Sequence, residues 1–159
     1  MKIRIGFGYD VHRLAEGEIL WLGGILIPHA KGTVAHSDGD VVIHAVCDAM
    51  LGAAGMRDIG YHFPDNSDDL KNIDSKILLK RTSRLVHDEG FEIGNIDITV
   101  AAQQPKLKDY IPLMKETMAG ILGLDTGDVS VKATTTEKLG FEGREEGISV
   151  YAVVLLNRS

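Results

Sequence analysis

The feature that most constrains this chain of 159 residues is the alternation of side chains at its start. From Ile3 to Asp10, an apolar residue stands at every odd position, and a polar residue or glycine stands at every even position. A period of two is typical of a β-strand with one buried face. We therefore expect the chain to begin with a strand whose apolar side chains enter the core.

Asp10 and His12 follow each other on one face of this expected strand. Because successive side chains point to opposite faces, the two lie about 6.5 to 7 Å apart along the strand. One cation could be bound by both, and His44 is the nearest downstream residue that could be a third ligand. Three protein ligands with a fourth position open describe a catalytic zinc site. A capped turn beside a surface histidine explains Asp-x-His as well, so the spacing alone leaves both interpretations open.

Length and charge limit the class of protein. One domain over residues 1–159 is expected, because a chain of this length buries about two thirds of the surface that it exposes when unfolded. The formal net charge of −6 argues against nucleic-acid binding. The single cysteine, Cys47, cannot form an internal disulfide, which fits a reducing compartment. The start lacks the pattern of a signal peptide, and no apolar run reaches membrane-spanning length. We expect a soluble cytoplasmic protein with no membrane partner, or a protein of the plastid stroma if a transit peptide was removed.

Periodicity and turn residues predict the remaining elements. The expected hairpin has strands at 18–22 and 25–28; the expected helices span about 39–54, 75–89 and 107–122; and further strands are expected at 91–102, 129–135 and 147–156. The segments 30–39 and 56–72 are expected to be irregular, and 140–147 a turn or loop. This order predicts an α+β domain with helices on one face of a mainly four-stranded mixed sheet, plus an extra small hairpin.

The helix expected at 39–54 carries a row of polar residues. Asp40, His44 and Asp48 are spaced four apart, so they share one side of the helix. If this row lies beside the end of the first strand, His44 completes the cluster, and Asp40 can orient an imidazole. A solvated acidic face with one histidine explains the row equally well.

The start of this helix is also a candidate phosphate site. His36 to Asp40 span an expected loop-to-helix junction, where backbone N–H groups attract phosphate oxygens. Simple capping of the helix by Ser37 or Asp38 explains the same residues.

Two later stretches have the chemistry of nucleotide binding. In 102–106, Pro105 holds a turn and Lys106 offers a positive charge to phosphate. In 132–138, Glu137 stands beside threonines and lysines, where its carboxylate suits a second, hard cation held jointly with phosphate oxygens. Threonines are also ordinary strand residues. Taken together, the residues indicate a metal-assisted enzyme that acts on a phosphorylated or nucleotide substrate.

With these residues in view, the chain resembles the 2-C-methyl-D-erythritol 2,4-cyclodiphosphate synthases of the non-mevalonate isoprenoid pathway. The resemblance extends nearly end to end. It is carried, in chain order, by Gly8-Tyr9-Asp10-Val11-His12, Ala35-His36-Ser37-Asp38-Gly39-Asp40, Asp58-Ile59-Gly60, Phe63-Pro64-Asp65, Pro105-Lys106 and Lys132-Ala133-Thr134-Thr135-Thr136-Glu137-Lys138-Leu139-Gly140-Phe141. The resemblance implies an α+β homotrimer with active sites between adjacent subunits.

The family's reaction implies a phosphorus-oxygen lyase. The substrate would be 4-diphosphocytidyl-2-C-methyl-D-erythritol 2-phosphate, whose 2-phosphate attacks the β-phosphorus; the products are the cyclic diphosphate and CMP. Zinc would be bound by Asp10, His12 and His44. A second divalent ion, magnesium or manganese, would be bound by Glu137 together with the substrate diphosphate.

The resemblance also implies which residues bind the rest of the substrate. The expected substrate-binding residues are His36, Ser37, Asp58, Gly60, Phe63 and Asp65. The expected cytidine-binding residues, from the neighbouring subunit, are Ala102, Pro105, Lys106, Leu107, Ala133, Thr134, Thr135 and Glu137. Phe141 and Arg144 would lie at a threefold cavity that can enclose a prenyl diphosphate. The residues around Pro105-Lys106, namely Gln104, Leu107 and Lys108, depart from the family pattern.

Two rival functions are consistent with the same residues. In a zinc phosphohydrolase, metal-bound hydroxide would attack in place of the internal phosphate. A non-catalytic nucleotide-binding or metal-storage protein would release no CMP.

Overall fold

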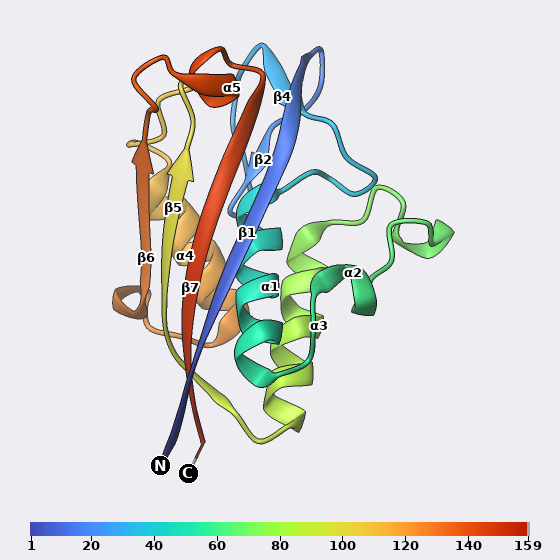
Figure 1. Cartoon of the computed structure of the whole chain (residues 1–159), viewed down its shortest axis with the longest axis vertical. Helices are drawn as coiled ribbons and strands as arrows, with labels where there is room; N and C mark the ends of the chain where they lie inside the picture. Colours follow the sequence, from blue (N-terminus) through green and yellow to red (C-terminus); the bar gives the residue numbers. More distant parts are fainter. Residues whose placement is uncertain (159) are drawn as a thin grey trace.

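The computed structural model describes residues 1–158 as a five-stranded sheet with helices on one face and a separate two-stranded hairpin (Figure 1). The strands are β1 (Lys2–Glu16), β2 (Trp21–Leu22), β3 (Ile25–Leu26), β4 (Lys31–Thr33), β5 (Glu92–Ala101), β6 (Val129–Thr134) and β7 (Gly147–Arg158). The α-helices are α1 (Val41–Ala54), α2 (Ile59–His62), α3 (Ser75–Asp88), α4 (Ile111–Leu122) and α5 (Gly140–Gly143), with 3₁₀ turns η1 (Asp68–Leu70) and η2 (Thr126–Asp128). The α+β class predicted from the sequence is confirmed.

The sheet has the strand order β4-β1-β7-β5-β6. Strands β1 and β7 pair antiparallel along nearly their whole length, from Lys2 opposite Arg158 to Arg13 opposite Gly147. Strands β5 and β6 pair in parallel, so the sheet is mixed as expected. The long β1–β7 pair brings the two ends of the chain side by side (Figure 1).

The expected count of four main strands is wrong by one. Lys31–Thr33 forms a short edge strand, β4, which pairs antiparallel with Leu14 to Glu16. Sequence analysis assigned this segment to an irregular stretch, because three residues of the type Lys-Gly-Thr show no alternation of apolar and polar side chains. The hairpin around Gly23 and Gly24 is confirmed, with shorter strands than expected.

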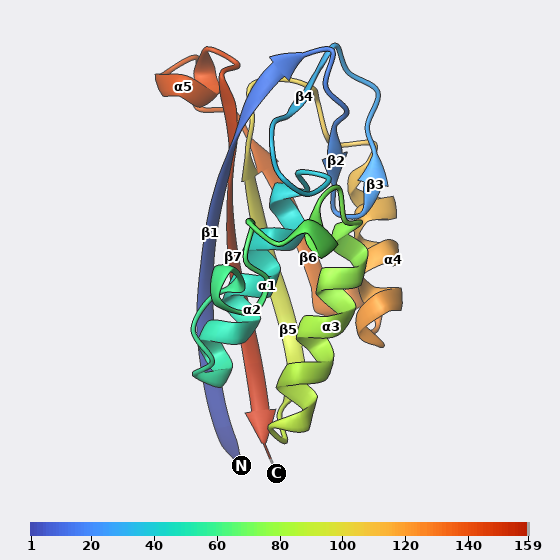
Figure 2. The same ribbon diagram turned by 90° about the vertical axis from the view of Figure 1, so that its right-hand side faces the viewer.

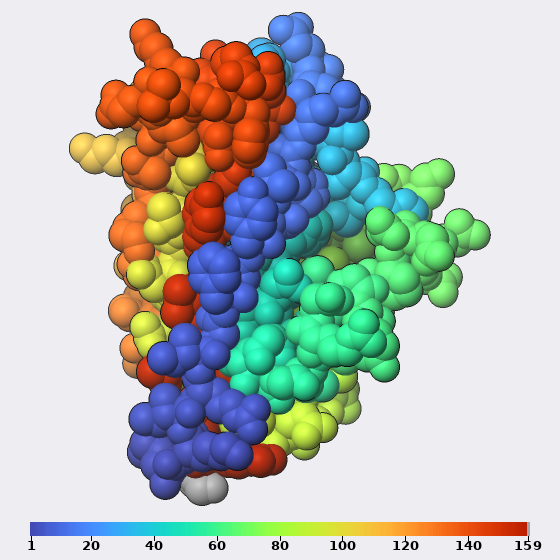
Figure 3. Space-filling model, viewed as in Figure 1, coloured from blue at the N-terminus to red at the C-terminus, as the bar shows by residue number. Residues whose placement is uncertain are grey.

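Helix α1 packs on one face of the sheet against β1 and β7, and α3 packs against α1 (Figure 2). The buried core lies between these two layers. The opposite face of β1 and β7 is not covered by any described helix and is visible along the middle of Figure 3. Helices α1, α3 and α4 therefore lie on one face of the sheet, as predicted, whereas the single turn α5 projects on the other side (Figure 2).

The expected burial of β1 is wrong, because its apolar face is the uncovered one. The side chains of Ile5 and Phe7 are 70% and 62% exposed, whereas Gly6 and Gly8 are buried under α1. A Cβ atom on either glycine would lie 1.9 Å from a carbonyl oxygen of α1. Glycine thus allows the helix to approach the strand closely, and this contact determines which face is covered.

The N-cap of α1 is Asp40, not Ser37 or Asp38 as expected. Its carboxylate is fully buried and accepts hydrogen bonds from the backbone N–H groups of Gly23 (2.9 Å), Gly24 (2.7 Å) and Ile43 (3.0 Å). Burial raises the pKa of this carboxyl above its ordinary value, while the three N–H donors favour the ionised form. The interpretation of a solvated acidic helix face is therefore wrong, and Asp40 instead joins the hairpin to α1.

Three other segments differ in detail from the prediction. The stretch expected to be one long loop contains α2 and η1. Helix α4 begins at Ile111, four residues late, because Leu107 to Tyr110 form a separate turn closed by the backbone N–H of Tyr110 on the carbonyl of Leu107 (2.9 Å). Residues 140–147 include the single helical turn α5.

None of the helices described between residues 1 and 158 is both long and apolar enough to cross a membrane. The expected cytoplasmic location stays a prediction.

Candidate active site

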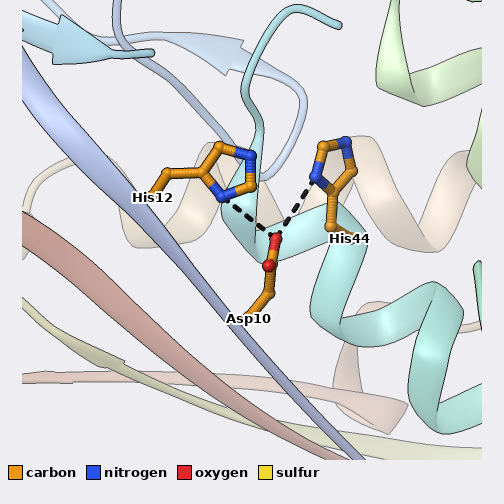
Figure 4. Close-up of side chains that lie close together, drawn as sticks. All are labelled: Asp10, His12 and His44. Carbon is orange, nitrogen blue, oxygen red and sulfur yellow. Dashed lines mark ion pairs between the residues drawn. The ribbon is translucent and has the colours of Figure 1, made fainter. Parts of the chain in front are cut away.

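Two elements bring three potential metal ligands together, as predicted. Asp10 and His12 extend from one face of β1, and His44 extends from α1 toward them (Figure 4). The Asp10 Oδ2 atom lies 3.2 Å from Nδ1 of His12 and 3.2 Å from Nδ1 of His44. One ligand atom from each residue lies within 4.8 Å of the other two. The triad is thus assembled within a single chain.

The atoms at the centre of the triad lack hydrogen-bond partners. Within the described residues, Asp10 Oδ2 and His12 Nδ1 are buried and accept or donate no hydrogen bond of acceptable geometry. Burial of such groups is unfavourable unless something else satisfies them. One carboxylate and two imidazoles form a donor set that suits a divalent transition metal. The three residues therefore fit a bound metal ion.

The charges of the triad depend on one another. Burial raises the pKa of Asp10, but the attraction between its carboxylate and the two nearby imidazoles outweighs burial and holds the pKa at about 2. For His44, burial lowers the pKa, and the carboxylates of Asp10, Asp40 and Asp38 raise it to a net value above the ordinary one. Asp10 is therefore an anion at neutral pH and is available to a cation.

The triad borders a cavity of about 400 Å³. Five of the six expected substrate-binding residues line it, and they are His36, Ser37, Gly60, Phe63 and Asp65. Asp58 does not line the cavity; its carboxylate accepts a hydrogen bond from the backbone N–H of Tyr61 (2.8 Å) and caps α2. The apolar part of the lining was not predicted, although two of its members lie in the motifs quoted above. It consists of Ala35 and Ile59, from those motifs, and of Leu70, Ile73 and Leu78, for which the sequence offers no motif.

Asp48 was expected to belong to the polar row of α1, and the structure gives it a specific contact. Its Oδ1 atom accepts a hydrogen bond from the backbone N–H of Ile59 (2.8 Å). Ile59 and Gly60 line the cavity, so Asp48 anchors the first turn of α2 beside it.

A second cavity, of about 330 Å³, lies at the ends of β5 and β6. All of the expected cytidine-binding residues except Glu137 line this cavity. The expected residues that line it are Ala102, Pro105, Lys106, Leu107, Ala133, Thr134 and Thr135. None of the described residues lines both cavities. In the strand order β1-β7-β5-β6, β1 lies about 10 Å from β5 and about 14 Å from β6.

Glu137, Phe141 and Arg144 lie near the second cavity's end of the sheet. Glu137 is exposed and has a positive φ of 54°, a conformation that turns the chain sharply. Arg144 is exposed, as expected, and its guanidinium donates to Glu146 through Nε (3.0 Å) and a terminal nitrogen (3.2 Å). Helix α5, which contains Phe141, projects on the side of the sheet away from α1, α3 and α4 (Figure 2).

Fold and site together define a class: an α+β protein with a carboxylate–dihistidine triad that fits a metal ion and borders a cavity of small-molecule size. The chain belongs to the YgbB family, whose model matches residues 3–157.

Relatives and solved structures agree with this assignment. The chain is 65% identical over 158 residues to the 2-C-methyl-D-erythritol 2,4-cyclodiphosphate synthase of Bacteroides fragilis, with 99% of each chain covered. It matches the bifunctional IspDF of Campylobacter jejuni with a TM-score of 0.96 and 49% identity, covering 99% of this chain and 43% of that longer one. It matches IspF of Plasmodium falciparum, solved as a CDP complex, with a TM-score of 0.86 and 38% identity, covering 99% of this chain and 97% of the other.

Proposed function

We propose that this chain is a cyclodiphosphate synthase, which converts 4-diphosphocytidyl-2-C-methyl-D-erythritol 2-phosphate to 2-C-methyl-D-erythritol 2,4-cyclodiphosphate and CMP. The observation that carries the proposal is the convergence of Asp10, His12 and His44 at the edge of a cavity lined by His36 and Ser37. In the reaction, an oxygen of the 2-phosphate forms a bond to the β-phosphorus. The bond from that phosphorus to the bridging oxygen breaks, and CMP leaves with its electron pair.

We assign zinc to the triad, because two imidazoles and one carboxylate are the ligand types of catalytic zinc sites. When bound, zinc would polarise a phosphate oxygen and offset its negative charge. The protein need supply no nucleophile, because the attacking oxygen belongs to the substrate.

The residues around the cavity would orient the substrate. Ser37 lines the cavity and can donate its hydroxyl proton to a phosphate oxygen. The ring of His36 is held by its Nε2 atom, 3.1 Å from the carbonyl oxygen of Ser67, so its other edge can face the substrate. The apolar part of the lining suits the methyl-bearing carbon skeleton. Positioning of the two phosphates would supply most of the rate.

We assign the second cavity to cytidine and Glu137 to a magnesium or manganese ion shared with the substrate diphosphate. A cavity lined by apolar residues together with threonine and lysine suits a base and its phosphates. One exposed carboxylate cannot hold Mg²⁺ alone, and the phosphate oxygens would complete the coordination.

A homotrimer would bring the two kinds of cavity together across subunits. The uncovered face of β1 and β7 forms an exposed apolar surface, which we call the open sheet face: Ile3, Ile5, Phe7, Tyr9, Val11, Tyr151 and Val153. A contiguous apolar surface of this extent is typical of a protein–protein interface. Helix α5 projects on the same side of the sheet (Figure 2), and its residue Phe141 and its C-cap Arg144 would then border a threefold cavity able to take a prenyl diphosphate.

Phosphorus NMR of the reaction with zinc and magnesium present tests the proposal. The synthase produces a cyclic diphosphate and CMP in equal amounts. Release of methylerythritol 2,4-bisphosphate with CMP would instead identify a phosphohydrolase, and no release of CMP would identify a binding protein.

A further inference from the structure

We infer that Ser75, itself held by Asp38, fixes the tautomer of His44 and thereby selects Nδ1 as the atom that binds the metal. The inference rests on the proposed function, since it concerns the metal site. Ser75 is fully buried and does not line the substrate cavity, so it would act as a positioning residue.

The two nitrogen atoms of the His44 ring face different partners. Nδ1 lies 3.2 Å from Asp10 Oδ2, on the side of the triad. Nε2 lies on the opposite side, 3.0 Å from the Ser75 hydroxyl oxygen and 3.2 Å from that of Ser37. A neutral imidazole carries one proton, so only one of these sides can receive an N–H.

The Ser75 hydroxyl cannot supply a proton to His44 because it already donates that proton to Asp38. The Ser75 Oγ atom donates to Asp38 Oδ1, and the Ser75 backbone N–H donates to Asp38 Oδ2 (2.8 Å). The backbone N–H of Asp40 also donates to Asp38 Oδ1 (3.1 Å). A carboxylate offers only acceptors, so the hydroxyl proton of Ser75 must point toward it.

Ser75 therefore presents only lone pairs to His44, and the ring must carry its proton on Nε2. The lone pair of Nδ1 then points at Asp10 Oδ2, and two acceptors face each other across 3.2 Å. The carboxylate of Asp10 would favour a proton on Nδ1. The contact between Asp10 Oδ2 and His44 Nδ1 lacks hydrogen-bond geometry, however, whereas the contact between Nε2 and Ser75 has it. A cation between the two acceptors resolves the conflict, as expected for a metal ligand set by its outer hydrogen bond.

The same arrangement frees Ser37 for the substrate. Its oxygen lies within hydrogen-bond distance of Nε2 and also accepts the backbone N–H of Gly39 (3.2 Å). With both contacts directed at its lone pairs, the hydroxyl proton of Ser37 can point into the cavity that it lines.

Backbone hydrogen bonds hold the two segments that carry this network. The N–H of Asp38 donates to the carbonyl of Ile73 (3.1 Å), and the N–H of Asn72 donates to the carbonyl of His36 (2.8 Å). These bonds fix the loop before α1 against the start of α3. Asp38 therefore lies within reach of Ser75 independently of any metal.

The first test needs no variant. A two-bond ¹H–¹⁵N spectrum of the metal-free protein separates the two tautomers when it is recorded at a pH above which the His44 signals no longer change, so that the ring is neutral. The signal of His44 is assigned by its loss in His44→Gln. We expect a protonated Nε2 and a bare Nδ1. A proton on Nδ1 of the wild-type residue would overturn the inference.

The second test measures zinc affinity by competition with a chromophoric chelator. We expect Ser75→Ala to weaken zinc binding about 10- to 100-fold, as outer-shell losses do at other metal sites. Ser83→Ala makes the same change in the same helix, away from the triad, and is the matched control. Equal affinities of the two variants would contradict the role of Ser75. Absence of zinc binding by the wild type would instead refute the proposed metal site.

Asp38→Ala provides a reversal test. It removes the carboxylate that accepts the hydroxyl proton of Ser75. The hydroxyl can then turn and donate to Nε2, so the proton of His44 should move to Nδ1 and zinc affinity should fall at least as far as in Ser75→Ala. An unchanged tautomer with wild-type affinity in Asp38→Ala would contradict the inference.

Discussion

The two cavities of this chain differ in how much of a working site each one forms alone. The cavity beside the triad has its potential ligands already converged and half-buried, and hydrogen bonds to Ser37 and Ser75 hold the ring of His44. Four residues that line the cavity at β5 and β6 are exposed, namely Lys106, Lys108, Ala133 and Thr134, and only Ala102 and Leu107 are buried.

The difference shows what burial contributes to each half of the proposed active site. The metal half is the triad with its cavity, and the open half is the cavity at β5 and β6. A cation site needs convergent donors in a dry environment, which one chain can provide by packing a helix on a strand. A nucleotide site needs enclosure, and an open cavity obtains it from a neighbour. We therefore expect a substitution in the triad to remove the metal. A substitution on the open sheet face should leave the metal in place.

His44→Ala should have the largest effect. Loss of one of three ligands should remove stoichiometric zinc and lower kcat by about 10²–10³-fold or more, because charge stabilisation at the reacting phosphate is lost. Metal analysis and the CMP-release assay measure both, and gel filtration should show an unchanged trimer. His87→Ala, which removes an exposed histidine of α3, is the control. Full zinc content in His44→Ala would contradict the ligand assignment.

Phe7→Asp should break the assembly and leave the metal half intact. Phe7 is 62% exposed in one chain, so a charge there affects the open sheet face rather than the core. We expect light scattering to report a monomer that keeps one zinc per chain and loses about a hundredfold in activity, since the reacting groups are no longer positioned. Ile77→Asp, at an exposed position of α3, should remain trimeric. A fully active monomer would refute a site shared between subunits.

Glu137→Gln should have a smaller and more specific effect. The change removes one anionic ligand from the open half, so the magnesium or manganese concentration for half-maximal activity should rise about tenfold. Zinc content should stay the same. Glu116→Gln, on an exposed position of α4, is the matched control. An unchanged metal titration would argue against the assignment of Glu137.

Cys47 should show the smallest effect, on the reactivity of its thiol and on the pH dependence of stability. Burial between α1 and the core raises the pKa of its thiol to about 12. The folded state therefore keeps the proton that the unfolded chain releases near pH 8.5, and stability should fall as pH rises between these values. Iodoacetamide at pH 9 should modify Cys47 only as fast as the protein unfolds. Complete modification within minutes in native buffer would show that the helix layer opens readily.

The metal triad could be predicted because it depends on local periodicity. A period of two makes Asp10 and His12 share a face, and a chemically suitable third residue, His44, lies in the next helix. Periodicity does not reveal which face of a strand is covered, and for β1 the prediction was wrong. The sequence feature that could have identified the covered face was the pair Gly6 and Gly8, because glycine within a strand often marks a close approach of another backbone.

The contacts that support the site depend on the tertiary fold and have no signature along the chain. Ser75 follows the N-cap of α3, and Asp38 precedes α1, so each alone resembles an ordinary capping residue. Their pairing spans 37 positions and depends on how the loop before α1 packs against α3. The buried role of Asp40 likewise depends on the docking of the hairpin.

Mixing two inactive variants tests most directly whether each active site combines halves from two copies. His44→Ala disables the metal half, and Ala133→Trp fills the cavity of the open half at an exposed position. After equal amounts are unfolded and reassembled together, with mixed trimers verified by native mass spectrometry, each site has a one-in-four chance of two intact halves. We predict recovery of about a quarter of wild-type activity. Mixed trimers that remain inactive would contradict a site shared between subunits.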